Sequence, residues 1–159
     1  MDELLKLLRQ NALETPKNLA RMLNMDEAAV KAKIRDYEAS GVIRGYQAIV
    51  NEESLGLNVV HAVIEVKITP ERDGGFNRIA ERVGRFPEVD ALYLMSGTYD
   101  LLLFVTGHDL RQVASFVSEK LATLQGVIST TTHFMLKTYK EDGVLMRPEQ
   151  NDERLKVSP

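Results

Sequence analysis

The chain has 159 residues and a mass of 17.9 kDa, a length that suits one large domain or two small ones. It contains no cysteine, which excludes disulfides, thiol catalysis and cysteine-based zinc or iron–sulfur sites. The start is acidic, and no apolar run approaches the roughly 20 residues that cross a bilayer. We therefore expect a cytoplasmic protein without a membrane partner.

The net charge of −3 is distributed unevenly along the chain. Residues 1–50 carry eight Lys/Arg and seven Asp/Glu, a balance of +1, whereas the remaining residues carry twelve basic and sixteen acidic groups, a balance of −4. A local basic face, and not the charge of the whole chain, decides whether a protein contacts nucleic acid. Nucleic-acid binding by the first fifty residues is therefore compatible with an acidic chain.

The first fifty residues predict three short helices and an extended segment. A leucine stripe behind acidic residues indicates the first helix, and Thr15 followed by Pro16 is a typical start for the second. Asp26 is a suitable N-cap for the third helix, which Gly41 ends. The inward face of that helix recurs at spacings of four and three: Val30, Ile34 and Tyr37. Residues 42–50 have the β-branched and aromatic composition of extended structure.

Residues 51–58 are predicted to be a linker, and the pattern changes beyond them. Strands are predicted at 59–68, 89–95, 99–106 and 127–139, and helices at 73–85 and between Asp109 and Gly126. This β-α-β-β-α-β order is that of an α+β, ferredoxin-like domain over residues 59–142. Helices cover one face of such a sheet, so a second copy of the chain is the usual cover for the other. The polar residues 143–159 predict a mobile tail.

Three stretches of sequence together carry a family resemblance. They are Val30-x-x-Lys33-Ile34-x-x-Tyr37-Glu38-x-x-Gly41-Val42-Ile43-Arg44-Gly45-Tyr46, then Gly97-Thr98-Tyr99-Asp100 with three leucines, then Gly126-Val127-Ile128-x-x-x-Thr132-x-Phe134-x-Leu136-Lys137-x-Tyr139-Lys140. On these motifs residues 1–142 resemble the Lrp/AsnC family of transcriptional regulators. The resemblance implies a winged helix-turn-helix over residues 1–50 that binds double-stranded DNA, and a ligand-binding and dimerisation domain over residues 59–142. It also implies dimers that assemble into tetramers or octamers, and an amino-acid effector in place of a cofactor.

The outward face of the third helix is the candidate DNA reader. Lys31 and Arg35 stand one turn apart there, which suits phosphates or guanine edges in the major groove. The alternative is a solvated helix with local ion pairs, such as Glu27 with Lys31, and the resemblance favours DNA. Relatives commonly have Ser or Thr at position 28 and Arg near 32, so the alanines found here weaken base readout but not phosphate contact. The candidate DNA-binding residues are Lys17, Ala28, Lys31, Lys33, Arg35 and Arg44.

The Gly97-Thr98-Tyr99-Asp100 segment is the candidate effector site. The Asp100 carboxylate suits the ammonium group of a zwitterion, and the amides of Gly97 and Thr98 suit its carboxylate. The alternative is a structural hairpin in which Asp100 binds turn amides. In relatives the hydroxyls after the Gly-Val pair lie near the effector, and strand alternation places Thr130 and Thr132 on one face. The candidate effector residues are Gly97, Thr98, Tyr99, Asp100, Thr130 and Thr132.

Catalysis and metal binding find little support in the sequence. The three histidines, His61, His108 and His133, lack the spacing of a metal site, and no nucleotide or hydrolase motif occurs. The preferred interpretation is a non-enzymatic, DNA-binding regulator that responds to an amino acid or a similar metabolite. One alternative is an enzyme that resembles the siroheme decarboxylases, with His61 or His133 near a tetrapyrrole. The other is a DNA-architectural protein without an effector.

Overall fold

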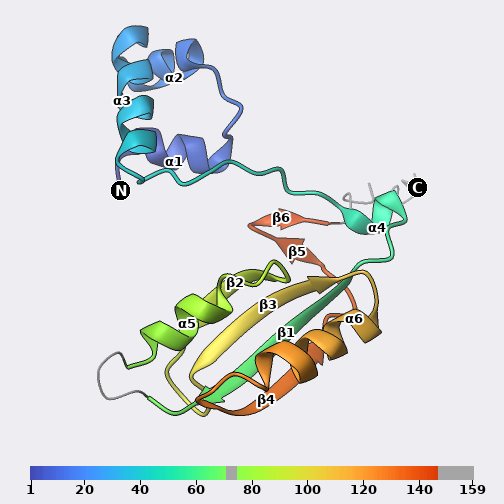
Figure 1. Cartoon of the computed structure of the whole chain (residues 1–159). Coiled ribbons are helices and arrows are strands. Elements are labelled where there is room, and N and C mark those ends of the chain that lie inside the picture. The colour runs from blue at the N-terminus through green and yellow to red at the C-terminus, as the bar shows by residue number, and fades with distance from the viewer. Residues whose placement is uncertain (71–74, 147–159) are drawn as a thin grey trace, which may run out of the picture. The chain divides into compact units, whose positions relative to one another are not determined.

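The computed structural model describes residues 1–70 and 75–146. The chain divides into two compact units, Met1–Ala48 (unit 1) and Ile49–Pro159 (unit 2) (Figure 1). Within the described ranges, no helix is long and apolar enough to cross a membrane.

Unit 1 consists of α1 (Glu3–Gln10), α2 (Pro16–Leu23) and α3 (Glu27–Ala39). The side chain of Asp2 accepts a hydrogen bond from the N–H of Leu4, Thr15 caps α2, and Asp26 caps α3. Each such cap is worth about 1 kcal/mol, because it satisfies a helix N–H that has no partner in the helix. The predicted starts of the second and third helices are confirmed.

The core of unit 1 is small. Its buried side chains are Leu4, Leu8, Leu19, Ala20 and Val30. Ile34 and Tyr37 pack against them, so the predicted inward face of the third helix is confirmed. Residues 42–50, predicted as an extended segment, form no strand. A strand needs a hydrogen-bonding partner, and unit 1 contains no other strand. Of these residues, Ile43 packs against the core, and its N–H donates to the carbonyl of Tyr37 at 2.9 Å.

Unit 2 is built on an antiparallel sheet. Its strands are β1 (Val60–Ile68), β2 (Val89–Leu94), β3 (Leu101–Gly107) and β4 (Val127–Phe134), in the spatial order β2-β3-β1-β4. The helices are α5 (Asn77–Val83) and α6 (Leu110–Ser115), and α6 continues into the π-helical segment η1 (Phe116–Leu121). This is the ferredoxin-like arrangement, and the predicted fold class is confirmed.

α5 and the continuous α6–η1 segment cover the same face of the sheet. α5 supplies Ile79 and Val83 to the core, and η1 supplies Phe116 and Leu121. The strands supply alternate residues: Ile64, Val66, Ile68, Leu101, Leu103 and Val105. α5, α6 and η1 leave the other sheet face uncovered, and we call it the open face. On β1 and β3 it is formed by His61, Val63, Glu65, Lys67, Leu102, Phe104 and Thr106.

Several predicted boundaries in unit 2 need correction. The predicted linker contains the short helix α4 (Glu52–Leu55), which Asn51 caps and Gly56 ends. The last long strand stops at Phe134, and not at residue 139, because its pairing with β1 ends at the pair of Phe134 with Ala62. Residues 140–145, across the start of the predicted tail, form a hairpin of β5 (Lys140–Glu141) and β6 (Val144–Leu145). Residues 73–74 of the predicted helix and residues 147–159 of the tail lie outside the described residues.

Candidate DNA and ligand sites

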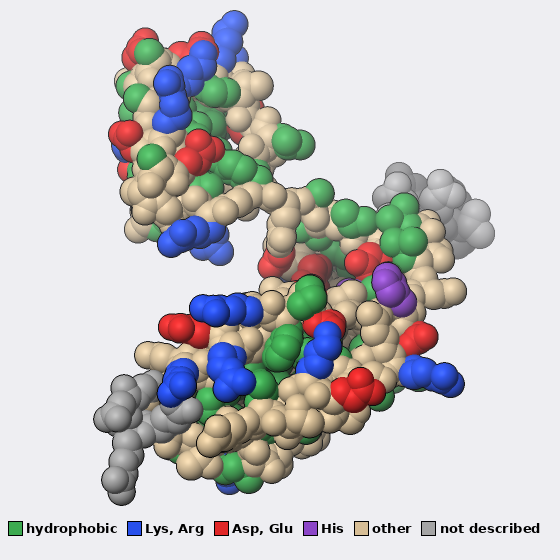
Figure 2. Space-filling view, in the orientation of Figure 1, with side chains coloured by type: hydrophobic (Ala, Val, Ile, Leu, Met, Phe, Trp, Pro, Cys, Tyr) green, Lys and Arg blue, Asp and Glu red, His purple; other side chains and the backbone are tan. Residues whose placement is uncertain are grey.

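The turn between α2 and α3 sets the orientation of the third helix. Asn24 has a left-handed backbone, with φ of 50°, and the N–H of Met25 donates to the carbonyl of Ala20 at 2.9 Å. Val30 is fully buried, so the core fixes which side of α3 faces solvent. That side carries Ala28, Lys31, Ala32 and Arg35, all exposed, and we call it the α3 face. Figure 2 shows Lys and Arg side chains standing out from the α2–α3 part of unit 1, with acidic groups between them.

Two of the six predicted DNA-binding residues are the cations of this face. Lys31 pairs with Glu27 at 2.6 Å, one turn away, and both side chains are about half exposed. Such an exposed pair is worth only about 0.3–0.5 kcal/mol, so it competes weakly with a phosphate for the lysine. Arg35 forms no ion pair within the described residues. The structure thus brings Ala28, Lys31 and Arg35 together on one exposed helix side.

The other three predicted residues lie in different surroundings. Lys33 pairs with Asp2 at 2.7 Å, and this hydrogen bond raises the pKa of Lys33 and lowers the pKa of Asp2. Lys33 therefore ties α3 to the start of α1. The guanidinium of Arg44 lies against Gly41, where an added Cβ would come within 3.0 Å of Cζ. Lys17 is exposed in the first turn of α2.

The predicted effector loop, residues 97–100, is fastened to the end of β1. The N–H of Ile68 donates to Oδ2 of Asp100 at 2.8 Å, and the N–H of Asp100 donates to the carbonyl of Val66 at 3.0 Å. The N–H of Met95 closes the loop by donating to the carbonyl of Asp100 at 2.8 Å. The Asp100 carboxylate, predicted to bind the ligand, thus has one oxygen already hydrogen-bonded within the protein. Its donor is a strand amide 32 residues away and not an amide of the turn.

The tip of this loop presents unused backbone donors. Gly97 has φ of 134°, a conformation that favours glycine, and Gly97 and Thr98 are exposed. The N–H groups of Gly97, Thr98 and Tyr99 donate to no residue that the structure describes. Successive free amides in a loop attract anions such as a carboxylate.

Thr130 and Thr132 stand on β4, on the side of the sheet that the helices cover. They pair with Val66 and Ile64, whose side chains are buried, whereas Thr131 pairs with Glu65 of the open face. The predicted alternation of these threonines is therefore confirmed. Since Asp100 and Thr130 flank Val66 from opposite sides, the loop and Thr130 lie at the same end of the sheet, one strand apart.

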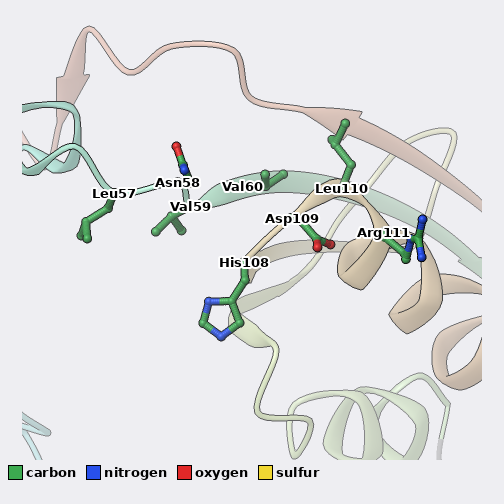
Figure 3. Close-up of a pocket in the computed structure, with 8 residues that line it drawn as sticks. All are labelled: Leu57, Asn58, Val59, Val60, His108, Asp109, Leu110 and Arg111. Atoms are coloured by element: carbon green, nitrogen blue, oxygen red, sulfur yellow. The ribbon is translucent and has the colours of Figure 1, made fainter.

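A depression of about 550 Å³ lies at the other end of the sheet. Figure 3 shows the apolar residues Leu57, Val59 and Val60 along the entry to β1, facing the turn between β3 and α6. In this view the side chains of His108 and Arg111 point away from each other, so they do not converge on one ligand group. Sequence reasoning missed this depression, because it depends on the pairing of Val60 with Gly107 across the sheet.

The two histidines considered for a tetrapyrrole are on the open face, and both contact carboxylates. His61 lies 2.6 Å from Oε2 of Glu52 through Nε2 and 3.0 Å from the hydroxyl of Thr106 through Nδ1. Nε2 of His133 lies 3.2 Å from Oε1 of Glu65. Among the described residues no group of three or more His, Asp or Glu side chains is placed to hold a metal ion.

These observations define a class of protein. A helix-turn-helix with an exposed, partly basic third helix is joined to a ferredoxin-like unit with a loop of free amides. That combination is typical of DNA-binding regulators with a separate ligand domain.

Comparison with known proteins gives the family. A model of the Lrp/AsnC ligand binding domain matches residues 61–145, and a model of winged helix-turn-helix DNA-binding domains matches residues 3–44. The chain is 43% identical to the uncharacterized HTH-type transcriptional regulator YugG of Bacillus subtilis, over 99% of this chain and 95% of that protein. It is 32% identical to the proline dehydrogenase transcriptional activator of Rhodobacter capsulatus, over 77% of this chain and 79% of that one.

A solved structure extends the likeness. The transcriptional regulator NMB0573 of Neisseria meningitidis, in complex with L-Met, superposes with a TM-score of 0.69 and 26% identity, covering 89% of this chain and 93% of that chain. The chain belongs to the Lrp/AsnC family of transcriptional regulators.

Proposed function

We propose that this transcriptional regulator binds double-stranded DNA through the α3 face and responds, without catalysis, to an amino acid or a similar small metabolite. The observation that carries the proposal is the exposure of Lys31 and Arg35 on a helix whose opposite side is fixed in the core by Val30. A helix held in this way after a left-handed turn presents a rigid side to the major groove.

The composition of the α3 face determines what kind of DNA recognition it supports. Lys31 and Arg35 supply positive charge, and Lys31 exchanges Glu27 for a phosphate at little cost, because its pair is exposed. Ala28 and Ala32 allow close approach to the groove but donate no hydrogen bond to a base edge. Phosphate contact therefore supplies most of the affinity, and sequence preference comes from Arg35 and from DNA shape.

A charge-matched comparison tests the α3 face. Lys31→Gln with Arg35→Gln removes two positive charges from it, and Lys6→Gln with Arg9→Gln removes two from exposed positions on α1. Binding to mixed-sequence duplex DNA is measured by fluorescence anisotropy over a salt series. The α3 variant should lose affinity, and its salt slope should fall by up to about two units per protomer, since each phosphate contact contributes roughly 0.9. Equal behaviour of parent and α3 variant at every salt concentration would overturn the assignment.

A second copy of the chain is the proposed cover for the open face. That face carries Val63, Leu102 and Phe104 on its central strands, and Tyr93, which is 53% exposed, packs edge-on against Phe104 at 6.0 Å. An apolar patch of this kind marks an association surface. Phe104→Glu should therefore reduce the mass seen by light scattering toward the 17.9 kDa of one chain. Leu110→Glu, at an exposed leucine on α6, is the control that should leave the mass unchanged.

The proposed effector site is the tip of the 97–100 loop. The free amides of Gly97, Thr98 and Tyr99 suit the carboxylate of an amino acid. Asp100 keeps its Oδ1 atom for the ammonium group while Oδ2 holds Ile68. The L-Met complex of NMB0573 supports an amino-acid effector by family likeness.

Two variants at one position separate ligand binding from folding. A thermal-shift screen against the twenty amino acids identifies a ligand, which stabilises the protein by mass action. Thr98→Pro removes one free amide, and Thr98→Ala keeps that amide and removes only the hydroxyl. The proline variant should lose the ligand-induced shift and the alanine variant should keep it. A proline variant that binds as tightly as the parent would place the effector elsewhere.

A further inference from the structure

The outward side of α5 in unit 2 is basic. Arg78 and Arg82 lie one turn apart on this helix, Arg85 follows its C-cap, and all three are exposed. The opposite side is fixed in the core by Ile79 and Val83, with exposed fractions of 2% and 0%. Core packing therefore holds the arginines toward solvent. Figure 2 shows Lys and Arg side chains gathered over this helix.

This surface is basic, although the unit that carries it has a net negative charge. Residues 51–159 carry a balance of −4, yet α5 and the residues after it up to Arg85 carry a single carboxylate, that of Glu81. In the described ranges 1–70 and 75–146, neither Arg82 nor Arg85 forms an ion pair. Other cations of the chain do pair with carboxylates: Lys31, Lys33 and Lys120.

Helix stability accounts for only part of this pattern. Arg82 is in the last turn of α5, where a cation interacts favourably with the negative end of the helix dipole. Arg85 lies beyond the end of the helix at Val83, and its N–H donates to the carbonyl of Arg82 at 3.3 Å. That turn keeps the two backbones adjacent, so two guanidinium groups project from one short segment.

We infer that Arg82 and Arg85 form a second DNA contact, which binds phosphates of the backbone. The inference rests on the proposed DNA binding of unit 1. A guanidinium is planar, always charged and matches two phosphate oxygens at once. Only two residues separate Arg82 from Arg85, and phosphates of one DNA strand recur about every 3.4 Å along the axis, so the long, flexible arginine side chains reach neighbouring phosphates.

DNA is favoured over an acidic protein partner because the two units are one chain. Once unit 1 is on DNA, the α5 arginines are tethered near it at an effective concentration in roughly the millimolar range. Two contacts that are too weak to bind DNA alone then add to the affinity. Phosphate contacts read no bases, so this contribution is the same for every sequence and disappears at high salt.

The test compares two double variants of the full chain. Arg82→Gln with Arg85→Gln removes the α5 pair, and Arg111→Gln with Lys140→Gln removes two other exposed charges of unit 2. Binding to short and long mixed-sequence duplexes is measured over a salt series. In the parent and the control, the longer duplex should bind more tightly per site. In the α5 variant, this gain should vanish and the salt slope should fall by up to about two units per protomer.

Each contrary result has a distinct meaning. If the α5 variant binds both duplexes like the parent at every salt concentration, the second contact does not exist, and the α3 face stands or falls by its own variants. If the α5 variant instead loses mass by light scattering without DNA and keeps the parent's salt slope, the arginines bind another copy of the chain, which overturns the inference. If the parent binds no DNA, the proposed function fails as well.

Discussion

The two units reach a fixed structure by different routes. In unit 1 the core joins three helices whose caps lie two or three residues from the amides that they bind. In unit 2 the core joins strands and helices far apart in the chain, and the loop at residues 97–100 is held by a carboxylate–amide bond that spans 32 residues. A local fold presents its functional side chains through helix register, whereas a non-local fold presents them through sheet register. The α3 face and the 97–100 loop are examples of the two.

The largest expected effect comes from emptying a core site in each unit, which compares the stability of unit 1 with that of unit 2. Leu19→Ala in unit 1 and Leu103→Ala in unit 2 each empty a site with 0% exposure, at a cost of about 3–5 kcal/mol. A unit of 48 residues is stable by only roughly 2–7 kcal/mol, so Leu19→Ala should unfold much of unit 1 and leave unit 2 folded. Hydrogen exchange measures the two units separately. Equal loss of protection in both units of the Leu19 variant would show that they fold together.

The sequence predicts unit 1 well where the signals are local. Thr15 and Asp26 mark helix starts, because a cap acts within its own turn, and the spacing of Val30, Ile34 and Tyr37 predicts the buried side of α3. The side of Lys31 and Arg35 follows from that register. The ion pair of Lys33 with Asp2 does not, because it depends on how α1 packs against α3.

In unit 2 the sequence predicts the elements and their order, but not the contacts between them. Alternation along β1 predicts two sheet faces, yet the partner of Asp100 depends on which amide the pairing of β1 and β3 brings close. The end of β4 at Phe134 is set by how far its pairing with β1 extends, a property of neither segment alone. The helix α4 was missed because one turn carries no periodicity.

A glycine substitution sharpens the contrast, because unit 2 depends on a close approach between distant segments. Gly126→Ala would place a Cβ 2.6 Å from Cδ1 of the buried Ile79, at φ of 94°. Overpacking and the left-handed backbone together should cost about 2–4 kcal/mol. The control Gly143→Ala has φ of 89° but meets no atom within 4 Å, so it should cost only the backbone term. Denaturant unfolding measures both, and equal losses would show that Ile79 moves aside freely.

Removing one carboxylate from each unit compares a hydrogen bond between neighbouring residues with one between residues far apart in the chain. Asp26→Ala removes an N-cap of α3, at a cost of about 0.5–2 kcal/mol, and water can replace the cap because the site is exposed. Asp100→Ala leaves the N–H of Ile68 without its partner in a half-buried place, at a cost of about 1–3 kcal/mol. Asp100→Asn keeps an oxygen acceptor and should recover part of the loss. An alanine variant at Asp100 as stable as the parent would show that the bond does not hold the loop.

Acid titration gives the smallest difference between the units. A hydrogen bond from Lys120 holds the pKa of Glu88 in unit 2 below its ordinary value of 4.5, although burial opposes the shift. A hydrogen bond from Lys33 likewise holds the pKa of Asp2 in unit 1 below 3.8. A carboxyl with a lowered folded pKa stabilises its unit above the unfolded pKa, and this stabilisation is lost as the pH falls through the folded pKa.

The carboxylate in unit 2 should matter more, because the side chain of Glu88 is 15% exposed and that of Asp2 is 34% exposed, so solvent screens the Glu88 pair less. Glu88→Gln should lower the stability of unit 2 at neutral pH and converge with the parent as the pH falls through the lowered folded pKa of Glu88, where the parent's carboxyl becomes protonated too. Asp2→Asn should do the same to unit 1 with a smaller amplitude. Denaturant midpoints over a pH series measure this, and a gap between Glu88→Gln and the parent that does not change with pH would show that Lys120 adds nothing to stability.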